Sequence, residues 1–384
     1  MRLARRIEAL PPYLFAELDR KVAARRAAGA DVISLGVGDP DLPTPPHIVE
    51  ALREAAADPW THRYPSYYGM GELREAIAAF YGRRFGVELD PETEVLPLIG
   101  SKEGLAHLAF ATLDPGDEAL VPDPGYPVYA TSTALAGATP RWFPLDQSGG
   151  FLPDLEALPV GPATKLIWLN YPGNPTAAVA DGAFFTAAVA FAERHDLLIA
   201  HDAAYSEITF DGYVAPSALA APAGKDRVIE FGSLSKTYNM TGWRVGYAVG
   251  NRSAVGALAT LKTNLDSGIF NAVQRAAVAA LTGPQDHVDR IRAVYRARRD
   301  VVVDGFRDVG VPLKPPLGSI YVWVPVPSGH TAESFAGELL ESAAVVVAPG
   351  TGYGPAGEGF VRISLTVADD RLAEAMTRIR SRLS

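Results

Sequence analysis

Short apolar runs alternate with amphipathic stretches through the middle of the chain. The runs are three to five residues long, and helix-like stretches at 102–112, 182–194 and 253–262 lie between them. Short strands that alternate with helices are typical of a mostly parallel sheet with both faces covered. The pattern predicts strands at seven places: 95–99, 119–121, 141–143, 165–169, 197–200, 228–231 and 245–249.

The two ends of the chain have a different pattern. Before residue 94, the spacing of apolar residues predicts helices at 13–28, 46–57 and 71–84 and a short strand at 31–35. After residue 285, it predicts a long helix at 286–309, strands at 319–324, 345–348 and 360–365, and helices at 331–342 and 368–382. We therefore expect an N-terminal arm with part of a small domain at 1–45, a large domain at 46–285 and a small α+β domain at 286–384.

The composition narrows the classes of partner. The chain has 384 residues and a net charge of −9, from 35 basic and 44 acidic side chains, which argues against a nucleic-acid or anionic-membrane partner. It contains no cysteine, which excludes disulfides, cysteine metal sites and a thiol nucleophile. The basic N-terminus is not followed by the apolar run of a signal peptide, so we expect a cytoplasmic protein.

One segment between two predicted strands carries several reactive and polar groups. Lys236 follows the strand at 228–231 and a turn that contains Ser233 and Ser235, and Arg244 precedes the next strand. A lysine held beside a packed sheet loses solvent, which lowers its pKa and favours the neutral amine that forms a Schiff base with a carbonyl. Two hydroxyls and a guanidinium suit a phosphate. The segment suggests pyridoxal phosphate, although a surface lysine and a structural ion pair are equally compatible with it.

Polar residues also follow other predicted strands, where ligands bind to parallel sheets. Ser101 opens a helix after the first strand and could bind an anion or simply cap that helix. Tyr126 follows the second strand and could stack on a planar ring or cover the sheet edge. Asn174 lies between Gly and Pro after the fourth strand, where it is a rigid donor or a turn residue. These positions place their side chains at one edge of the sheet.

Two charged residues lie in apolar strands, where a charge needs a partner. Asp202 ends the fifth predicted strand and could pair with a protonated pyridine nitrogen, with Tyr205 near the ring oxygen, or accept loop N–H groups instead. Arg362 lies within the strand at 360–365 and matches a substrate α-carboxylate, or a structural glutamate. Each signal alone is ambiguous, but together they predict one pyridoxal-phosphate site.

The motifs in this order resemble those of fold-type I pyridoxal-phosphate aminotransferases of class I/II, along nearly the whole chain. They are Asn174-Pro-Thr, Asp202-x-x-Tyr205, Ser233-Leu-Ser-Lys236, Gly242-Trp-Arg244 and Arg362. The resemblance implies an α/β protein with a seven-stranded, mostly parallel sheet in its large domain and a smaller α+β domain. It also implies a homodimer with shared active sites, and an amino acid and a 2-oxo acid as substrates.

The resemblance further implies a role for each matching residue. Lys236 is expected to form the Schiff base and to move protons, Asp202 to pair with the pyridine nitrogen, and Tyr205 to bind the ring oxygen together with Asn174. Tyr126 is expected to stack on the ring, and Arg362 to bind the α-carboxylate with the help of Gly38 and Asn174. The phosphate is expected to contact Ser101, the backbone of Lys102, Ser233, Ser235, Arg244 and, from the neighbouring subunit, Tyr64.

Within the family, the segments around Asp202 and Lys236 resemble the LL-diaminopimelate aminotransferase group. Ala177 departs from the family pattern, which has glycine there, and this puts the turn after Thr176 in doubt. Candidates for the distal pocket are Tyr13, Tyr67 and, from the neighbouring subunit, Phe270 and Asn271. Alanine, aspartate, glutamate and aromatic donors stay open, as do a carbon–sulfur β-lyase on the same scaffold and a non-enzymatic ligand-binding protein.

Overall fold

The computed structural model describes residues 4–8, 10 and 14–383, and the side chains of 14–19 are outside that description. The helix predicted at 13–28 is α2 (Leu14–Ala27). Tyr13, a candidate for the distal pocket, lies outside the described residues. In the described part of the chain, no helix is long and apolar enough to cross a membrane.

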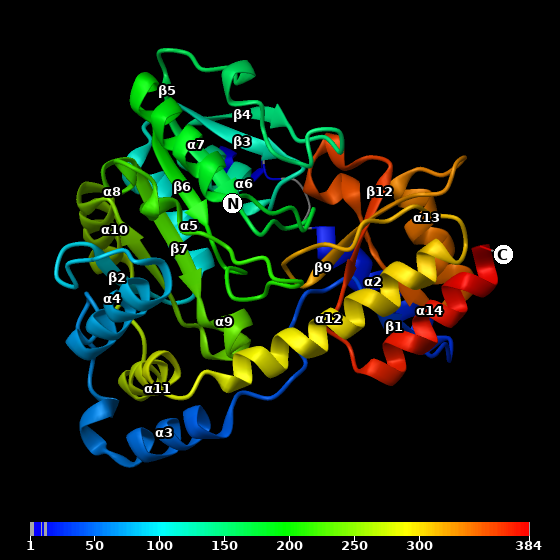
Figure 1. Ribbon diagram of the computed structural model, residues 1–384, viewed down its shortest axis with the longest axis horizontal. Coiled ribbons are helices and arrows are strands. Elements are labelled where there is room, and N and C mark those ends of the chain that lie inside the picture. The colour runs from blue at the N-terminus through cyan, green and yellow to red at the C-terminus, as the bar shows by residue number, and fades with distance from the viewer. Residues whose placement is uncertain (1–3, 9, 11–13, 384) are drawn as a thin grey trace.

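A seven-stranded sheet forms the centre of the larger part of the molecule (Figure 1). Its order is β2-β8-β7-β6-β5-β3-β4, and every strand runs parallel to the others except β8. The strands are β2 (Val95–Leu98), β3 (Glu118–Asp123), β4 (Thr139–Pro144), β5 (Thr164–Asn170), β6 (Leu198–Asp202), β7 (Val228–Ser233) and β8 (Gly246–Gly250). The prediction of a mostly parallel sheet with seven strands is therefore confirmed.

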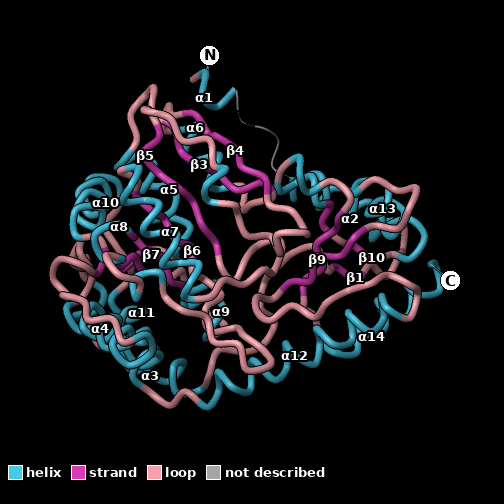
Figure 2. The backbone as a smooth tube through the Cα atoms, turned by 45° about the horizontal axis from the view of Figure 1, so that its top comes forward, coloured by secondary structure: helices cyan, strands magenta, loops and turns pink. Residues whose placement is uncertain are grey.

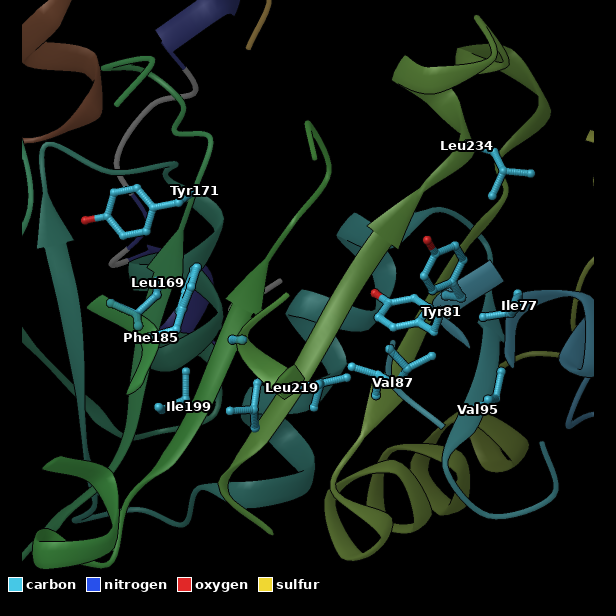
Figure 3. Close-up of a cluster of buried hydrophobic side chains, with 14 of the residues drawn as sticks. Ile77, Tyr81, Val87, Val95, Leu169, Tyr171, Phe185, Ile199, Leu219 and Leu234 are labelled. Atoms are coloured by element: carbon cyan, nitrogen blue, oxygen red, sulfur yellow. The ribbon is translucent and has the colours of Figure 1, made fainter. Parts of the chain in front are cut away.

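Helices cover both faces of this sheet because its strands are apolar on both sides. Along β5, Leu166 and Trp168 belong to one apolar core, and Ile167 and Leu169 belong to the core on the opposite face. Figure 3 shows Leu169 and Ile199 on neighbouring strands with other side chains of this second core. Helices α5 (Ser101–Thr112), α6 (Val128–Leu135) and α10 (Arg252–Leu265) cover the first face, and α3 (Pro46–Ala57), α4 (Gly71–Phe85), α7 (Gly182–His195) and α11 (Asn271–Thr282) belong to the second core.

The smaller part of the molecule contains two short sheets. Antiparallel β9 (Tyr321–Pro325), β12 (Phe360–Ser364) and β11 (Ala348–Pro349) form one, and β1 (Ile33–Ser34) pairs with β10 (Val345–Val346) in the other. Helices α12 (Asp286–Arg307), α13 (Ala332–Glu338) and α14 (Asp369–Leu383) surround them, and Figure 1 shows α12 extending from the α11 side to the α13 side. The domain boundaries at 45 and 285 stay predictions.

Two of the predicted elements in this part are divided. The strand predicted at 345–348 is β10 followed by β11, because Val345–Val346 pairs with β1 whereas Ala348–Pro349 pairs with β12. The helix predicted at 331–342 is α13 followed by a π-helical turn. The remaining short elements are α1 (Arg5–Glu8), α8 (Gly224–Arg227), α9 (Leu234–Thr237), η1 (Pro59–His62), η2 (Leu155–Ala157), η3 (Ala218–Ala220), η4 (Thr241–Trp243), η5 (Leu339–Ala343), η6 (Gly350–Tyr353) and η7 (Pro355–Gly357).

The carboxyl ends of the parallel strands mark one edge of the large sheet as the expected place of a ligand site. Strands β3, β5, β6 and β7 are parallel, so their carboxyl ends lie at the same edge. Figure 2 shows loops at that edge between the large sheet and the strands of the smaller part. The side chains that follow these strands meet there.

Candidate active site

Lys236 lies on the short helix α9, directly after β7. The Ser233 hydroxyl accepts a hydrogen bond from Ser235 N (3.2 Å) and so caps this helix. Lys236 Nζ donates to the carbonyl oxygen of Gly38 at 2.9 Å. Burial lowers the pKa of the Lys236 ammonium; Tyr321 and Asp39 oppose this shift, whereas the guanidiniums of Arg362 and Arg244 add to it. The site therefore favours the neutral amine.

Asp202 ends β6, between β5 and β7 in the sheet. Its side chain is 5% exposed, and its carboxylate accepts hydrogen bonds from Tyr129 Oη (2.8 Å) and Ala204 N (3.3 Å). Burial raises the pKa of this carboxyl, and these two hydrogen bonds oppose the rise. A cationic partner beside the carboxylate would offset the cost of its burial.

An anion site is built where α5 begins, next to the end of β2. Backbone N–H groups at the start of a helix attract anions, and Ser101 is the first residue of α5. Arg244 lies over Gly100, because a Cβ built on this glycine would lie 2.1 Å from Arg244 Nη2. Gly100 also has a φ of 78°, in the left-handed region that favours glycine. Glycine at this position therefore lets the Arg244 guanidinium lie against the start of α5.

Arg362 reaches the same region from β12 in the smaller part. Its side chain is buried, with Nη1 donating to Asn174 Oδ1 (2.8 Å) and Nη2 to Gly36 O (2.6 Å). The Tyr321 ring packs against the guanidinium, with 4.0 Å between Arg362 Cζ and the ring centre. Asn174 is itself held in place, because its backbone N–H donates to Asn170 Oδ1 at 2.7 Å.

These groups surround a cavity of about 450 Å³, within the size range of small-molecule sites. All the candidates for binding the cofactor and the α-carboxylate except Tyr64 line it: Gly38, Ser101, Lys102, Tyr126, Asn174, Asp202, Tyr205, Ser233, Ser235, Lys236, Arg244 and Arg362. Tyr64 does not line the cavity of its own chain, and its side chain is 86% exposed. The structure therefore brings together every cofactor and α-carboxylate candidate except Tyr64, whereas the distal-pocket candidates Tyr67, Phe270 and Asn271 do not line this cavity.

The donor set of the cavity fits pyridoxal phosphate. The two serine hydroxyls of the Lys236 turn, Ser101 and Arg244 supply donors for a phosphate, and glycine at position 100 leaves room for the Arg244 guanidinium beside the start of α5. The carboxylate of Asp202 and the amine of Lys236 line the same cavity, as the ring nitrogen and the aldehyde of this cofactor require.

Several residues that line the cavity or contact its lining residues were not predicted from the sequence. Tyr129 is fully buried and donates to Asp202, and Tyr321 Oη lies 3.2 Å from Tyr205 Oη. Tyr353 and Asp39 also line the cavity. Tyr129 could have been found from its spacing of three residues from Tyr126, once a helix after Pro127 is assumed. No sequence signal indicates Tyr321, because its place depends on the register of β9 against β12.

Ala177 adopts the conformation for which the family pattern uses glycine. Its φ is 56° and its side chain is 3% exposed. The turn is closed by hydrogen bonds from Ala177 N to Gly173 O (3.2 Å) and from Gly173 N to Ala178 O (2.8 Å). A left-handed alanine costs about 1–2 kcal/mol relative to glycine in this conformation, so the chain keeps the turn with modest strain.

Comparisons with known proteins identify the family of the chain. A model of the family "Aminotransferase class I and II" matches residues 30–379. An LL-diaminopimelate aminotransferase from Desulforudis audaxviator is 57% identical over 98% of this chain and 97% of its own length, and one from Moorella thermoacetica is 54% identical over 99% and 98%. A substrate-bound BacF structure from Bacillus subtilis superposes with a TM-score of 0.94 at 41% identity, covering 99% of this chain and 98% of that one.

Proposed function

The chain belongs to the class I and II aminotransferases, which use pyridoxal phosphate, and we propose that its amino donor is LL-diaminopimelate. Transamination moves the donor's amino group to a 2-oxo acid, for which we propose 2-oxoglutarate. The observation that carries this donor is the identity of 57% and 54%, over nearly complete chains, to relatives named for it. A role in lysine biosynthesis belongs to the same proposal.

In this proposal, different residues of the cavity bind different parts of the cofactor. Ser101, Ser233, Ser235, Arg244 and the backbone of Lys102 hold the phosphate, and Tyr126 packs on the ring. Asp202 holds the ring nitrogen in its protonated form, while Tyr205 and Asn174 bind the ring oxygen. When bound, pyridoxal phosphate supplies an aldehyde that takes up amino groups and a ring that withdraws electrons from the carbon beside them.

Lys236 and Arg362 act on the substrate. The neutral amine favoured by burial lets Lys236 Nζ accept the proton that leaves the substrate α-carbon and return it in the next step. Arg362 binds the α-carboxylate through its guanidinium, which Asn174 and Gly36 already hold in place. The substrate carbon is thus oriented toward Lys236, which donates to Gly38 in the same loop as Gly36.

A panel of amino donors tests this function. The purified enzyme is mixed with 2-oxoglutarate and with LL-diaminopimelate, alanine, aspartate or phenylalanine in turn, and glutamate formation is measured. We expect kcat/KM for LL-diaminopimelate to exceed that for every other donor by at least about 100-fold, as expected when a site binds distal polar groups that the others lack. Equal rates with aspartate would refute the proposed donor.

Keto-acid dependence separates transamination from the lyase reaction. The curated relatives are aminotransferases by name, which favours transamination over the carbon–sulfur β-lyase considered from the sequence. Substrate consumption should therefore stop when no 2-oxo acid is present. The expected cytoplasmic location stays a prediction.

We propose in addition that two chains form a homodimer with shared active sites. The segment around Tyr64 and the adjacent Phe270, whose ring packs on His62, present aromatic side chains to solvent, with Trp60 64%, Tyr68 54% and Phe270 42% exposed. Asn271 Nδ2 holds this segment through the carbonyls of Thr61 and Arg63. An ordered, exposed aromatic surface of this kind is typical of a protein interface. In the dimer, Tyr64 contacts the phosphate bound by the other chain.

The dimer has two measurable consequences. Sedimentation should give about twice the chain mass of 40.8 kDa. Tyr64→Phe should lower the affinity for pyridoxal phosphate roughly tenfold, because it removes a hydrogen bond to a charged group. Retained cofactor is measured by its absorbance after gel filtration, with Tyr68→Phe as the control. The proposal would be contradicted if the protein sedimented as a monomer and Tyr64→Phe bound pyridoxal phosphate as tightly as the wild type.

A further inference from the structure

Another buried carboxylate, Asp123, ends β3 at the same edge of the sheet as Asp202. Its side chain is 8% exposed. Burial raises the pKa of this carboxyl, and a hydrogen bond from Ala356 N opposes the rise. A buried carboxylate is costly, and Asp123 does not line the cofactor cavity. Its presence therefore requires another explanation.

Asp123 joins the large sheet to a loop of the smaller part of the molecule. Its Oδ1 accepts a hydrogen bond from Ala356 N at 2.9 Å. Close by, Gly125 N donates to the carbonyl oxygen of Tyr353 at 2.8 Å. Gly354 makes the approach possible, because a Cβ on it would lie 2.1 Å from Asp123 Oδ1 and its φ is 132°. The segment 123–125 and the loop 353–356 are thus fastened to each other at two points.

Both fastened segments carry rings of the active site. Tyr126 follows directly after Gly125, and Tyr353 begins the other segment. Both rings line the cavity. The Tyr353 ring packs on Arg362, with 4.9 Å between its centre and Arg362 Cζ, and its side chain is only 2% exposed. The contact between Asp123 and the 353–356 loop therefore supports the part of the cavity wall that packs on the Arg362 guanidinium.

We infer that Asp123 is a positioning residue for substrate binding: its carboxylate holds the 353–356 loop so that Tyr353 keeps Arg362 in place for the substrate α-carboxylate. The inference rests on the carboxylate-binding role proposed for Arg362. Asp123 touches neither cofactor nor substrate in this account. Its loss should therefore weaken the binding of carboxylates and leave the proton transfer at Lys236 unchanged.

Steady-state kinetics of the holoenzyme separates these effects. In Asp123→Ala, Ala356 N loses its acceptor, and we expect KM for both the amino donor and 2-oxoglutarate to rise roughly tenfold. The change in kcat should stay within about twofold. Asp123→Asn keeps an oxygen that can accept from Ala356 N, so its KM should stay within about threefold of the wild type. Rescue by the amide separates positioning from a need for charge.

A second variant and a binding measurement keep the inference testable if Asp123→Ala does not fold. Gly354→Ala places a methyl group against Asp123 Oδ1 and should raise KM at least as much as Asp123→Ala. This second variant keeps the test possible if Asp123→Ala does not fold. Asp146→Ala is the control, because the exposed Asp146 accepts from Gly149 N within a single loop. The dissociation constant of succinate from the holoenzyme should follow the same order. The succinate measurement does not depend on the amino donor, so it also tests the inference if the proposed donor is wrong.

Two outcomes would overturn the inference. The first is an unchanged KM and succinate affinity in folded Asp123→Ala and in Gly354→Ala. The second is a loss of kcat and cofactor in Asp123→Ala with carboxylate affinity intact, which would show that the residue supports the cofactor site instead. An elevated KM in both Asp123→Ala and Gly354→Ala, together with a normal KM in Asp123→Asn, supports it.

Discussion

Lys236→Ala is expected to lower kcat by at least about 10⁴-fold, the upper range for loss of a positioned acid–base group. The reason is that the substitution removes the amine that is proposed to move the proton at the substrate α-carbon. Among the described residues that line the cavity, Lys102 carries the only other amine, and its Nζ lies 5.8 Å from the centre of the Tyr126 ring. Turnover of the amino donor with 2-oxoglutarate measures the loss.

Covalent capture of the cofactor gives a second readout for the same variant. Treatment with sodium borohydride, followed by mass spectrometry, should show the cofactor fixed to the wild-type chain and absent from Lys236→Ala. Lys225→Ala is a matched control, because Lys225 pairs with Glu94 away from the cavity. A Lys236→Ala enzyme that keeps more than about 1% of kcat would show that another group moves the proton.

The large sheet could be predicted because its signal is local. The apolar runs that form strands such as β2, β5 and β8 are buried on both faces, so these strands are recognisable without knowledge of their neighbours, whereas the edge strand β4 is mostly exposed. Helix α11 gives a weaker signal, because alanines such as Ala276, Ala277 and Ala280 form most of its buried face. Small residues pack closely, as α11 does in the core that it shares with α3, but they contribute little to an apolar pattern.

The candidate site was predictable to the extent that it follows strand ends. Asp202, Asn174 and Lys236 come directly after parallel strands, and the rule for such sheets brings their side chains to one edge. Tyr321 could not be found in this way, because it reaches the site through the pairing of β9 with β12, where Trp323 lies opposite Arg362. Register between distant strands is a property of tertiary packing and is not written in either strand alone.

The loop 36–38 shows how the two parts of the molecule meet at the site. Gly36 O accepts from Arg362 on the smaller sheet, and Gly38 O accepts from Lys236 beside the larger one. A Cβ on Gly38 would lie 2.0 Å from Tyr321 Oη, so this position requires glycine. The proposed carboxylate-binding and proton-moving groups therefore both donate hydrogen bonds to one backbone segment.

Asp202→Asn is expected to lower kcat on the order of 10³-fold, the loss seen when a charge that stabilises a transition state is removed. The amide keeps the size of the side chain and can still accept from Tyr129 Oη, so the fold should persist. It carries no negative charge, however, and cannot hold the ring nitrogen in its protonated form. Single-turnover spectra with the amino donor measure the effect on the chemical step.

A carboxylate at the opposite end of the sheet supplies the control. Asp226 is exposed and precedes β7, so it lies at the amino ends of the parallel strands. Asp226→Asn should keep kcat within about twofold, as is usual for surface substitutions. Retention of cofactor by Asp202→Asn after gel filtration would separate lost chemistry from lost binding. If this variant bound cofactor and turned over at the wild-type rate, Asp202 would only be a buried hydrogen-bond acceptor for Tyr129.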